Sequence, residues 1–252
     1  MVLVNTDAVP GAVNGLLGRF AAANAVAFPG TALPRAVVTG TPVRPELDGL
    51  DRSPAGRREA RAMLGLPGER RTLAAFGGSL GARRINAAVA DLAARWLDRR
   101  DLSLYQVAGR RDYAQYAHES EGGDSAGPGG LAYEVVPYED RMPVLYRAAD
   151  LFVCRAGAMT VAELLVCGVP AILVPLPGAP RDHQTRNAEA LVAAGAAILV
   201  PDAECTADRL ETELAALLSD ADRLAAMGAA ARRLGHPDAA ATVAELVDAH
   251  AR

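Results

Sequence analysis

The strongest constraint on the fold of this chain is a regular alternation of short apolar runs with segments of helical periodicity. Seven apolar runs are predicted as strands, at residues 36–40, 72–76, 104–109, 132–136, 150–154, 171–175 and 196–200. Most of the segments between them carry apolar residues at helical spacing, as at 85–97, 161–167 and 183–194. Repeated strand–helix–strand units predict an α/β fold with a Rossmann-like, doubly wound parallel sheet covered by helices on both faces.

Composition narrows the class of protein further. The chain has 252 residues and a net charge of −4, and every basic residue is arginine. An acidic balance argues against nucleic acid as a partner. The three cysteines, Cys154, Cys167 and Cys205, are too few and too scattered for a disulfide framework or a zinc site, and we expect no metal.

The location that the sequence predicts is the cytoplasm. The first residues lack the basic and apolar regions of a signal peptide, and no apolar run approaches the ~20 residues of a membrane span. We therefore expect, at most, peripheral contact with the inner face of the plasma membrane.

The chain divides into four parts on the same criteria. Residues 1–40 are too few for a domain of their own and are predicted to hold a helix near 13–23 with short strands. Residues 41–56 are proline-rich and predict a linker, 57–237 form the Rossmann-like domain, and 238–252 hold a final helix. Two further helices are expected at 206–218, with Thr206 as N-cap, and at 221–234. A loop insertion is expected at 118–130.

Ligands of such sheets bind beyond the carboxyl ends of the strands, so the residues that follow each strand are the candidates for function. The first such turn is Gly77-Gly78-Ser79-Leu80-Gly81, which leads into a helix. Glycines allow close approach of a ligand, and a helix start offers free N–H groups to a phosphate. An ordinary tight turn fits the same spacing. The turn is neither a Walker loop nor a G-x-G-x-x-G motif.

The second turn lies within residues 154–168. Thr160 and Glu163 have the spacing of a capping box, in which Glu163 would only close the helix start. Alternatively, the Glu163 carboxylate accepts hydrogen bonds from two ribose hydroxyls while Ala158, Met159 and Thr160 present backbone N–H groups to a phosphate. Spacing alone favours the cap.

The third and fourth turns carry polar side chains. Residues 175–191 include Asp182, His183, Gln184 and Asn187, which are types suited to sugar hydroxyls, although a solvated helix start is the favoured explanation of this loop taken alone. The charged residues of 138–150 are best explained as a surface cap of the next helix. The sequence contains no cluster of metal ligands and no G-x-S-x-G elbow.

Taken together, three of these segments resemble one family. "GGSLGARRIN", "CRAGAMTVAELLVCGVPAILVPLP" and "DHQTRNAEALVAAGAA" are similar to the donor-binding half of the MurG family, which belongs to glycosyltransferase family 28. Residues 27–47 resemble its inter-domain stretch, with T-P-V-R in place of N-P-V-R. The resemblance runs from about residue 5 to the end of the chain.

The resemblance implies a GT-B fold and transfer of N-acetylglucosamine from UDP-GlcNAc, a donor substrate, to lipid I in peptidoglycan synthesis, with no cofactor. It implies that Ser79 and the Gly77–Gly81 turn face the diphosphate or sugar, that Ala158, Met159 and Thr160 lie under the α-phosphate, and that Glu163 binds ribose. The corresponding residues of the family also place Arg44 near the nucleotide. The donor-binding set is Asn5, Arg44, Gly77, Gly78, Ser79, Gly81, Ala158, Met159, Thr160, Glu163, His183, Gln184 and Asn187.

The sequence also departs from the family. The G-G-T-x-G-H loop that supplies the proposed base is not found, H-E-Q-N is reduced to Leu3-Val4-Asn5, and Leu80 replaces a common glutamine. Residues 1–40 therefore resemble a remnant of the acceptor domain, and the catalytic residues are unknown. The chain is expected to supply the donor-binding half of a transferase, with a separate N-terminal subunit or a homodimer as partner. The alternatives are a non-catalytic nucleotide-sugar-binding module and, third, a UDP-sugar epimerase.

Overall fold

The computed structural model describes residues 1–78, 81–120 and 130–251, without the side chains of 118–120. Ser79, Leu80 and most of the expected loop insertion at 118–130 therefore lie outside the described residues.

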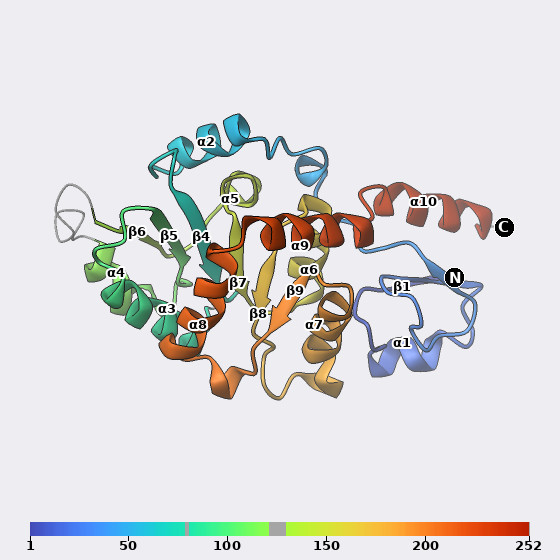
Figure 1. Ribbon diagram of the computed structural model, residues 1–252. Coiled ribbons are helices and arrows are strands. Elements are labelled where there is room, and N and C mark those ends of the chain that lie inside the picture. Colours follow the sequence, from blue (N-terminus) through green and yellow to red (C-terminus); the bar gives the residue numbers. More distant parts are fainter. Residues whose placement is uncertain (79–80, 121–129, 252) are drawn as a thin grey trace.

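The centre of the molecule is a six-stranded sheet in which all neighbouring strands are parallel. Its strands, in spatial order, are β6 (Ala132–Val136), β5 (Leu102–Val107), β4 (Arg71–Phe76), β7 (Leu151–Cys154), β8 (Ala171–Leu173) and β9 (Ala197–Leu199). Six of the seven predicted strands form this sheet, which Figure 1 shows with helices packed around it. The predicted α/β class is confirmed.

Helices connect successive strands and cover the sheet. They are α2 (Pro54–Met63), α3 (Arg83–Arg95), α4 (Tyr113–Ser120), α5 (Met142–Ala148), α6 (Ala158–Cys167), α7 (His183–Ala193), α8 (Ala207–Leu218) and α9 (Ala221–Leu234). Short 3-10 turns lie at η1 (Pro45–Leu47), η2 (Pro180–Asp182) and η3 (Asp202–Glu204).

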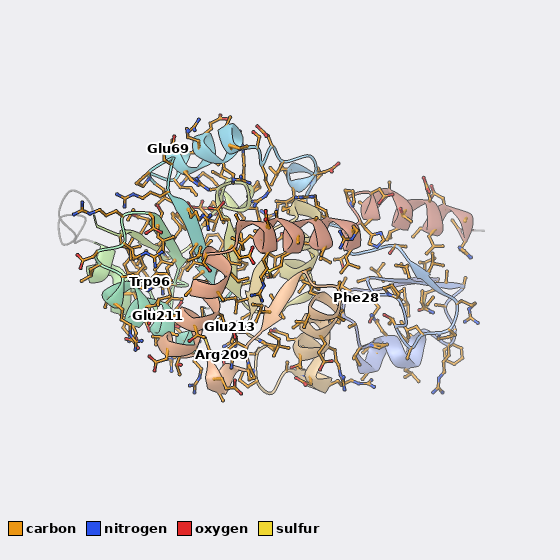
Figure 2. The ribbon with its side chains drawn as sticks, in the orientation of Figure 1. Phe28, Glu69, Trp96, Arg209, Glu211 and Glu213 are labelled. Carbon is orange, nitrogen blue, oxygen red and sulfur yellow. The ribbon has the colours of Figure 1, made fainter. Side chains whose placement is uncertain are left out.

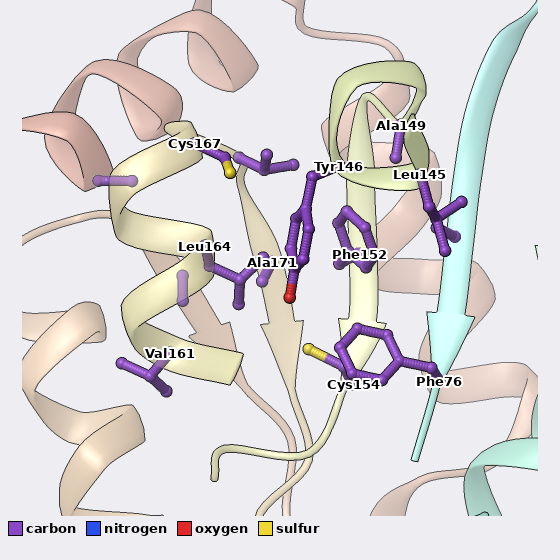
Figure 3. Close-up of a cluster of buried hydrophobic side chains, with 14 of the residues drawn as sticks. Phe76, Leu145, Tyr146, Ala149, Phe152, Cys154, Val161, Leu164, Cys167 and Ala171 are labelled. Atoms are coloured by element: carbon purple, nitrogen blue, oxygen red, sulfur yellow. The ribbon is translucent and has the colours of Figure 1, made fainter. Parts of the chain in front are cut away.

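The strands are buried on both faces because alternate residues enter two separate apolar clusters. Ala74 and Phe152 belong to the cluster under α2, α5, α6, α7 and α9, whereas Leu73 and Val153 belong to the cluster under α3 and α8. In the first cluster the Tyr146 ring lies beside Phe152, with centroids 4.9 Å apart, and Phe76 meets Phe152 edge-on at 5.6 Å. Figure 3 shows the Tyr146 hydroxyl pointing toward the carboxyl end of β7. This orientation matters for the site.

The predicted cap of α8 is confirmed. Thr206 Oγ1 accepts a hydrogen bond from the backbone N–H of Arg209 at 3.2 Å. Beyond the cap, α8 packs on α3, where Trp96 Nε1 donates to Glu211 Oε1 at 2.9 Å, and Arg209 pairs with Glu213 one turn along. These side chains lie together in Figure 2.

A second, three-stranded parallel sheet holds the N-terminal part, with β1 (Val2–Asn5), β2 (Ala23–Val26) and β3 (Ala36–Val38) in that order. The final helix, α10 (Ala239–Ala249), contacts β1 and β2, so both chain ends lie at the same end of the molecule. None of the described helices is both long and apolar enough to cross a bilayer.

One local prediction was wrong in extent. The first helix, α1, covers only Ala12–Leu17 rather than 13–23, because the chain turns at Gly18, whose carbonyl accepts from the buried Asn24 side chain at 3.0 Å. The segment predicted as linker contains η1 and the start of α2, where Ser53 Oγ accepts from the Gly56 N–H and Pro54 opens the helix.

The Thr206 cap provides a test of the fold. Thr206→Ala removes the side-chain acceptor at the start of α8 and should lower the free energy of unfolding by about 1 kcal/mol, measured by urea denaturation. Thr212→Ala is the matched control on the same helix, since its hydroxyl bonds only to the carbonyl of Asp208, and it should not destabilise the protein. Equal losses in the two variants would contradict the assigned cap.

Candidate functional site

Three of the four candidate turns meet around one cavity of about 950 Å³ at the carboxyl ends of the central strands. It is lined by Gly77, Gly78, Gly81, Ala82, Arg83, Arg84, Ala87, Arg111, Arg155, Gly157, Thr160, Leu176, Gln184 and Asp202. The turns after β4, β7 and β8 thus line a single cavity. Residues 138–150, the fourth candidate turn, do not line it.

The first turn requires glycine for two reasons. Gly78 and Gly81 have φ angles of +87° and +79°, and the Gly81 N–H donates to the Gly78 carbonyl at 2.9 Å. A Cβ at Gly81 would collide with the Ala108 carbonyl oxygen. These glycines are therefore needed to build the turn as well as to admit a ligand. Helix α3 then begins without a side-chain cap at Ala82, which leaves N–H groups of its first turn open at the cavity.

The capping-box interpretation of the second turn is wrong. Helix α6 starts at Ala158, with Gly157 as an N-cap that has no side chain to close it, so Thr160 already lies in the first helical turn. The good helix former Ala158 allows this early start, and the Val161 N–H bonds back to Gly157 at 2.9 Å. Glu163 therefore lies one turn too far along α6 to cap it.

Glu163 instead joins three distant elements. Its Oε2 accepts from the Tyr146 hydroxyl of α5 at 2.9 Å, and its Oε1 lies 3.5 Å from Arg44 Nε, just before η1. Burial raises the pKa of Glu163, although the Tyr146 hydrogen bond and the Arg44 charge oppose the rise. Burial also raises the pKa of Tyr146 well above its usual value, which keeps the phenol a donor.

Glu163 is not part of the cavity lining, but it is three residues from Thr160 and so lies on the neighbouring turn of the same helix face. A group bound at the start of α6 would have this carboxylate about one helical turn, or ~5 Å, away. Ala158 and Met159 occupy the first two positions of α6, and the Met159 side chain is exposed.

Gln184 locks two of the turns together. Its Oε1 accepts from the backbone N–H of Ala156 at 3.2 Å and of Leu176 at 2.9 Å. Because the oxygen is used in this way, the amide NH₂ remains to face the cavity, where within the described residues it has no acceptor.

The other polar residues of the third turn lie elsewhere. The fully buried Asn187 donates to Asp7 Oδ1 at 2.8 Å and to the Ala156 carbonyl at 3.1 Å, and its Oδ1 accepts from the Ala8 N–H at 2.8 Å. Both of its N–H groups are therefore engaged in tying α7 to the N-terminal part. His183 is not in the cavity lining and bonds to the Pro180 carbonyl at 2.8 Å.

Asn5, at the end of β1, is also buried. Its Nδ2 donates to the Asp7 carbonyl at 2.6 Å, and its Oδ1 accepts from Asn14 at 3.1 Å. Asn5 thus shapes the same segment, residues 7–8, that Asn187 holds.

Sequence analysis missed the charged residues of the cavity. Arg83, Arg84, Arg111 and Arg155 line it. Arg155 pairs with Asp202 at 2.6 Å, and Arg84 reaches the other oxygen of that carboxylate at 3.2 Å. Asp112, whose pKa is lowered by its hydrogen bond to Arg111, holds Arg83 and Arg111. The available signals were the position of Arg155 directly after a buried strand and that of Arg83 and Arg84 directly after the glycine turn.

The site can therefore bind an anion. Two helix starts without side-chain caps and four arginines face one cavity, and Asp202 is the single acidic residue among the described residues that line it. Among the described residues, no group of three His, Cys, Asp or Glu side chains is placed to hold a metal ion.

Comparison with known proteins identifies the family of this chain. Residues 72–243 match the glycosyltransferase family 28 C-terminal domain, which covers more than half of the chain. The chain belongs to glycosyltransferase family 28.

The curated relatives that this chain matches are longer than the chain. It is 43% identical over 251 residues to the UDP-N-acetylglucosamine–N-acetylmuramyl-(pentapeptide) pyrophosphoryl-undecaprenol N-acetylglucosamine transferase of a Nocardioides species, covering 98% of this chain and 65% of the relative. The transferase of the same name from Alkalilimnicola ehrlichii is also 43% identical, with 100% of this chain and 67% of the relative covered. The chain thus spans about two thirds of these relatives and includes their C-terminal half.

Solved structures agree on the fold. The crystal structure of Acinetobacter baumannii MurG superposes with a TM-score of 0.77 at 30% identity, over 98% of this chain and 66% of that protein. A Listeria monocytogenes structure described as a putative UDP-N-acetylglucosamine 2-epimerase superposes over 93% of this chain and 61% of that one, with a TM-score of 0.60 at 16% identity. The second likeness shows the fold alone, so the sequence relationship is to the transferases rather than to the epimerase.

Tyr146→Phe tests the environment of Glu163. The variant loses only the hydroxyl that stabilises the ionised carboxylate, so at neutral pH it should cost about 2 kcal/mol of unfolding free energy in urea. Because burial raises the pKa of Glu163, its ionised form is the less favoured one in this environment and gains most from the Tyr146 hydrogen bond. As the pH falls through this pKa, the neutral carboxyl needs the donor less and the loss should shrink.

Tyr138→Phe is the control for this prediction, because the Tyr138 ring is exposed and its hydroxyl makes no hydrogen bond within the described residues. It should change stability little at any pH. A loss in Tyr146→Phe that stays constant on acidification would contradict the assigned role of the hydroxyl.

Proposed function

We propose that this chain binds UDP-N-acetylglucosamine and acts as the donor-binding half of an N-acetylglucosaminyltransferase that acts on lipid I in peptidoglycan synthesis. The observation that carries the proposal is the meeting of two helix starts without side-chain caps, at Ala82 and Gly157, in one arginine-lined cavity with Glu163 on the next turn of α6. The names of the family 28 relatives supply the identity of the sugar and the acceptor.

The diphosphate would lie in the cavity. Free N–H groups at the starts of α3 and α6, with the charge of Arg155 and Arg84, compensate its negative charge, and Thr160 adds a hydroxyl. Ser79, outside the described residues, belongs to the same turn as Gly78 and remains a predicted contact.

The ribose would lie beside the next turn of α6. Glu163 can accept hydrogen bonds from two vicinal hydroxyls, and Arg44 beside it can contact the nucleoside. The amide NH₂ of Gln184 is the group of the third turn best placed for a sugar hydroxyl. Asn187, Asn5 and His183 would instead support the loops around the sugar, which replaces the direct contacts expected from sequence.

In the transfer, the acceptor hydroxyl oxygen forms a bond to the anomeric carbon as the bond to the β-phosphate oxygen breaks. UDP departs with the electron pair, and a base takes the hydroxyl proton. The helix starts and arginines would stabilise the charge that grows on UDP. No residue of this chain is assigned as the base. The chain would work in the cytoplasm at the membrane face, with an acceptor-binding domain on a partner chain or a second copy.

A non-catalytic nucleotide-sugar-binding module is the alternative. It is favoured by the departures at Leu3-Val4-Asn5, where the family's H-E-Q-N element has its histidine and glutamate. Both hypotheses require donor binding and differ only in turnover.

Glu163→Gln tests donor binding. Loss of two charge-assisted hydrogen bonds should weaken UDP-GlcNAc binding by about tenfold or more in titration calorimetry. Glu189→Gln makes the same charge change at an exposed position of α7 and should bind as the wild type does. If folded Glu163→Gln binds UDP-GlcNAc with unchanged affinity, Glu163 does not contact the donor and serves only as the hydrogen-bond partner of Tyr146.

The same pair of proteins has a second readout in pH. Because burial raises the pKa of Glu163, wild-type affinity should fall on mild acidification, whereas the affinity of Glu163→Gln should be nearly flat. Both phosphates of UDP-GlcNAc are esterified and stay ionised over this range, so the ligand itself does not supply the trend.

Transfer of labelled N-acetylglucosamine to a lipid I analogue separates the two hypotheses. The assay is run with this chain alone and with the N-terminal domain of a relative supplied separately. Product that depends on the supplied domain supports the transferase. Tight donor binding with no product in either mixture supports the binding module.

A further inference from the structure

A second cavity lies at the opposite edge of the main sheet, near the amino ends of its strands. It has a volume of about 340 Å³ and lies beside Arg71 at the start of β4, Asp150 before β7 and Pro170 before β8. The cavity proposed above to bind the donor, here called the donor cavity, lies at the carboxyl ends of the strands. The two cavities have no lining residue in common.

Four arginines surround this amino-edge cavity: Arg52, Arg57, Arg71 and Arg232. The other lining residues, apart from Asp150, are apolar or glycine, and several are small, such as Ala225 and Gly228 of α9. Among the described residues, the charged groups that line this cavity are four guanidinium groups and one carboxylate.

That carboxylate offsets only part of the positive charge of the four arginines. Asp150 Oδ2 already accepts from Arg61 Nη2 and from the Thr72 N–H, both at 2.7 Å, while its Oδ1 lies 3.6 Å from Arg57. Arg61 is not part of the lining, so Asp150 is mainly engaged outside the cavity. Asp220, next to the lining residue Ala221, caps α9 through the Arg223 N–H.

Three of the four arginines, Arg57, Arg71 and Arg232, keep most of their hydrogen-bonding capacity. Arg52 donates to carbonyls at the end of α5, including that of Ala149 at 2.9 Å; Arg57 and Arg71 each donate to one carbonyl. Arg232 makes no hydrogen bond or ion pair within the described residues. A guanidinium has five N–H donors, so a majority of the donors around this cavity are unused.

The positive charges are close enough to disfavour one another. Burial first, and then the charge of Arg57, lower the pKa of Arg52 to about 10; the charge of Asp150 opposes this shift, and Arg232 acts in the same direction as Arg57. An anion in the cavity would relieve this repulsion and supply acceptors for the free N–H groups.

We propose that the amino-edge cavity is a second anion site, which binds a phosphate-class oxyanion such as orthophosphate or pyrophosphate between Arg52, Arg57, Arg71 and Arg232. The forked N–H groups of arginine match phosphate oxygens, and a site with several guanidiniums and little competing acid selects a multiply charged anion. The site is independent of the donor cavity.

Pyrophosphate titration into the full chain, with saturating UDP present, tests the proposal. Arg232→Gln should weaken pyrophosphate binding by about tenfold. Arg233→Gln, the next residue on α9 and outside this cavity's lining, makes the same charge change and should stay within about twofold of the wild type. Arg232→Gln has no hydrogen bond to lose, and thermal melts of both variants check that they remain folded.

Arg57→Gln gives a second test from another element, α2, and should also weaken pyrophosphate binding. The proposal is overturned if wild-type protein fails to bind pyrophosphate at millimolar concentration, if Arg232→Gln and Arg57→Gln bind as the wild type does, or if UDP displaces the pyrophosphate. None of these outcomes depends on whether UDP-GlcNAc is the donor.

Discussion

The parallel pairing of β4, β7 and β8 is the constraint on which the rest of this structure depends. Phe76 pairs with Cys154, and Cys154 pairs with Leu173, so the three strands end at the same level. Each strand is followed by a turn and then a helix start, and the level ends place these turns side by side. The cavity at the carboxyl ends of these strands is a direct product of this register, because a slip of one residue would move the turns apart and reverse the buried faces of the strands.

The register also produces a difference in electrostatic environment between the carboxyl and amino ends of the strands. At the carboxyl edge, open helix starts add partial positive charge to arginines that are already paired with Asp202 and Asp112. At the amino edge, the positive charge comes from arginine side chains alone, and Asp150 is mostly engaged elsewhere.

Polar side chains on both sides of the cavity connect residues 1–44 to the domain that holds the six-stranded sheet. Asn187 binds Asp7 and Ala8 beside one turn of the cavity, and Glu163 pairs with Arg44 beside another. Residues proposed to contact the donor are therefore held by segments from the other part of the chain. Donor binding and the placement of the N-terminal part should be coupled through these contacts.

The amino-acid sequence by itself determined the α/β class, the strands of the main sheet, the cap at Thr206 and the glycine turn, since each depends on neighbours within a few residues. It also carried the family resemblance. Only the tertiary structure decided that Glu163 contacts Tyr146 and Arg44 instead of capping α6, because these partners lie on other elements and the helix starts at Ala158. The same holds for Asn187, whose partner Asp7 is 180 residues away, and for the arginines of both cavities. Side-chain partners at such separations depend on strand order and register, which local periodicity does not encode.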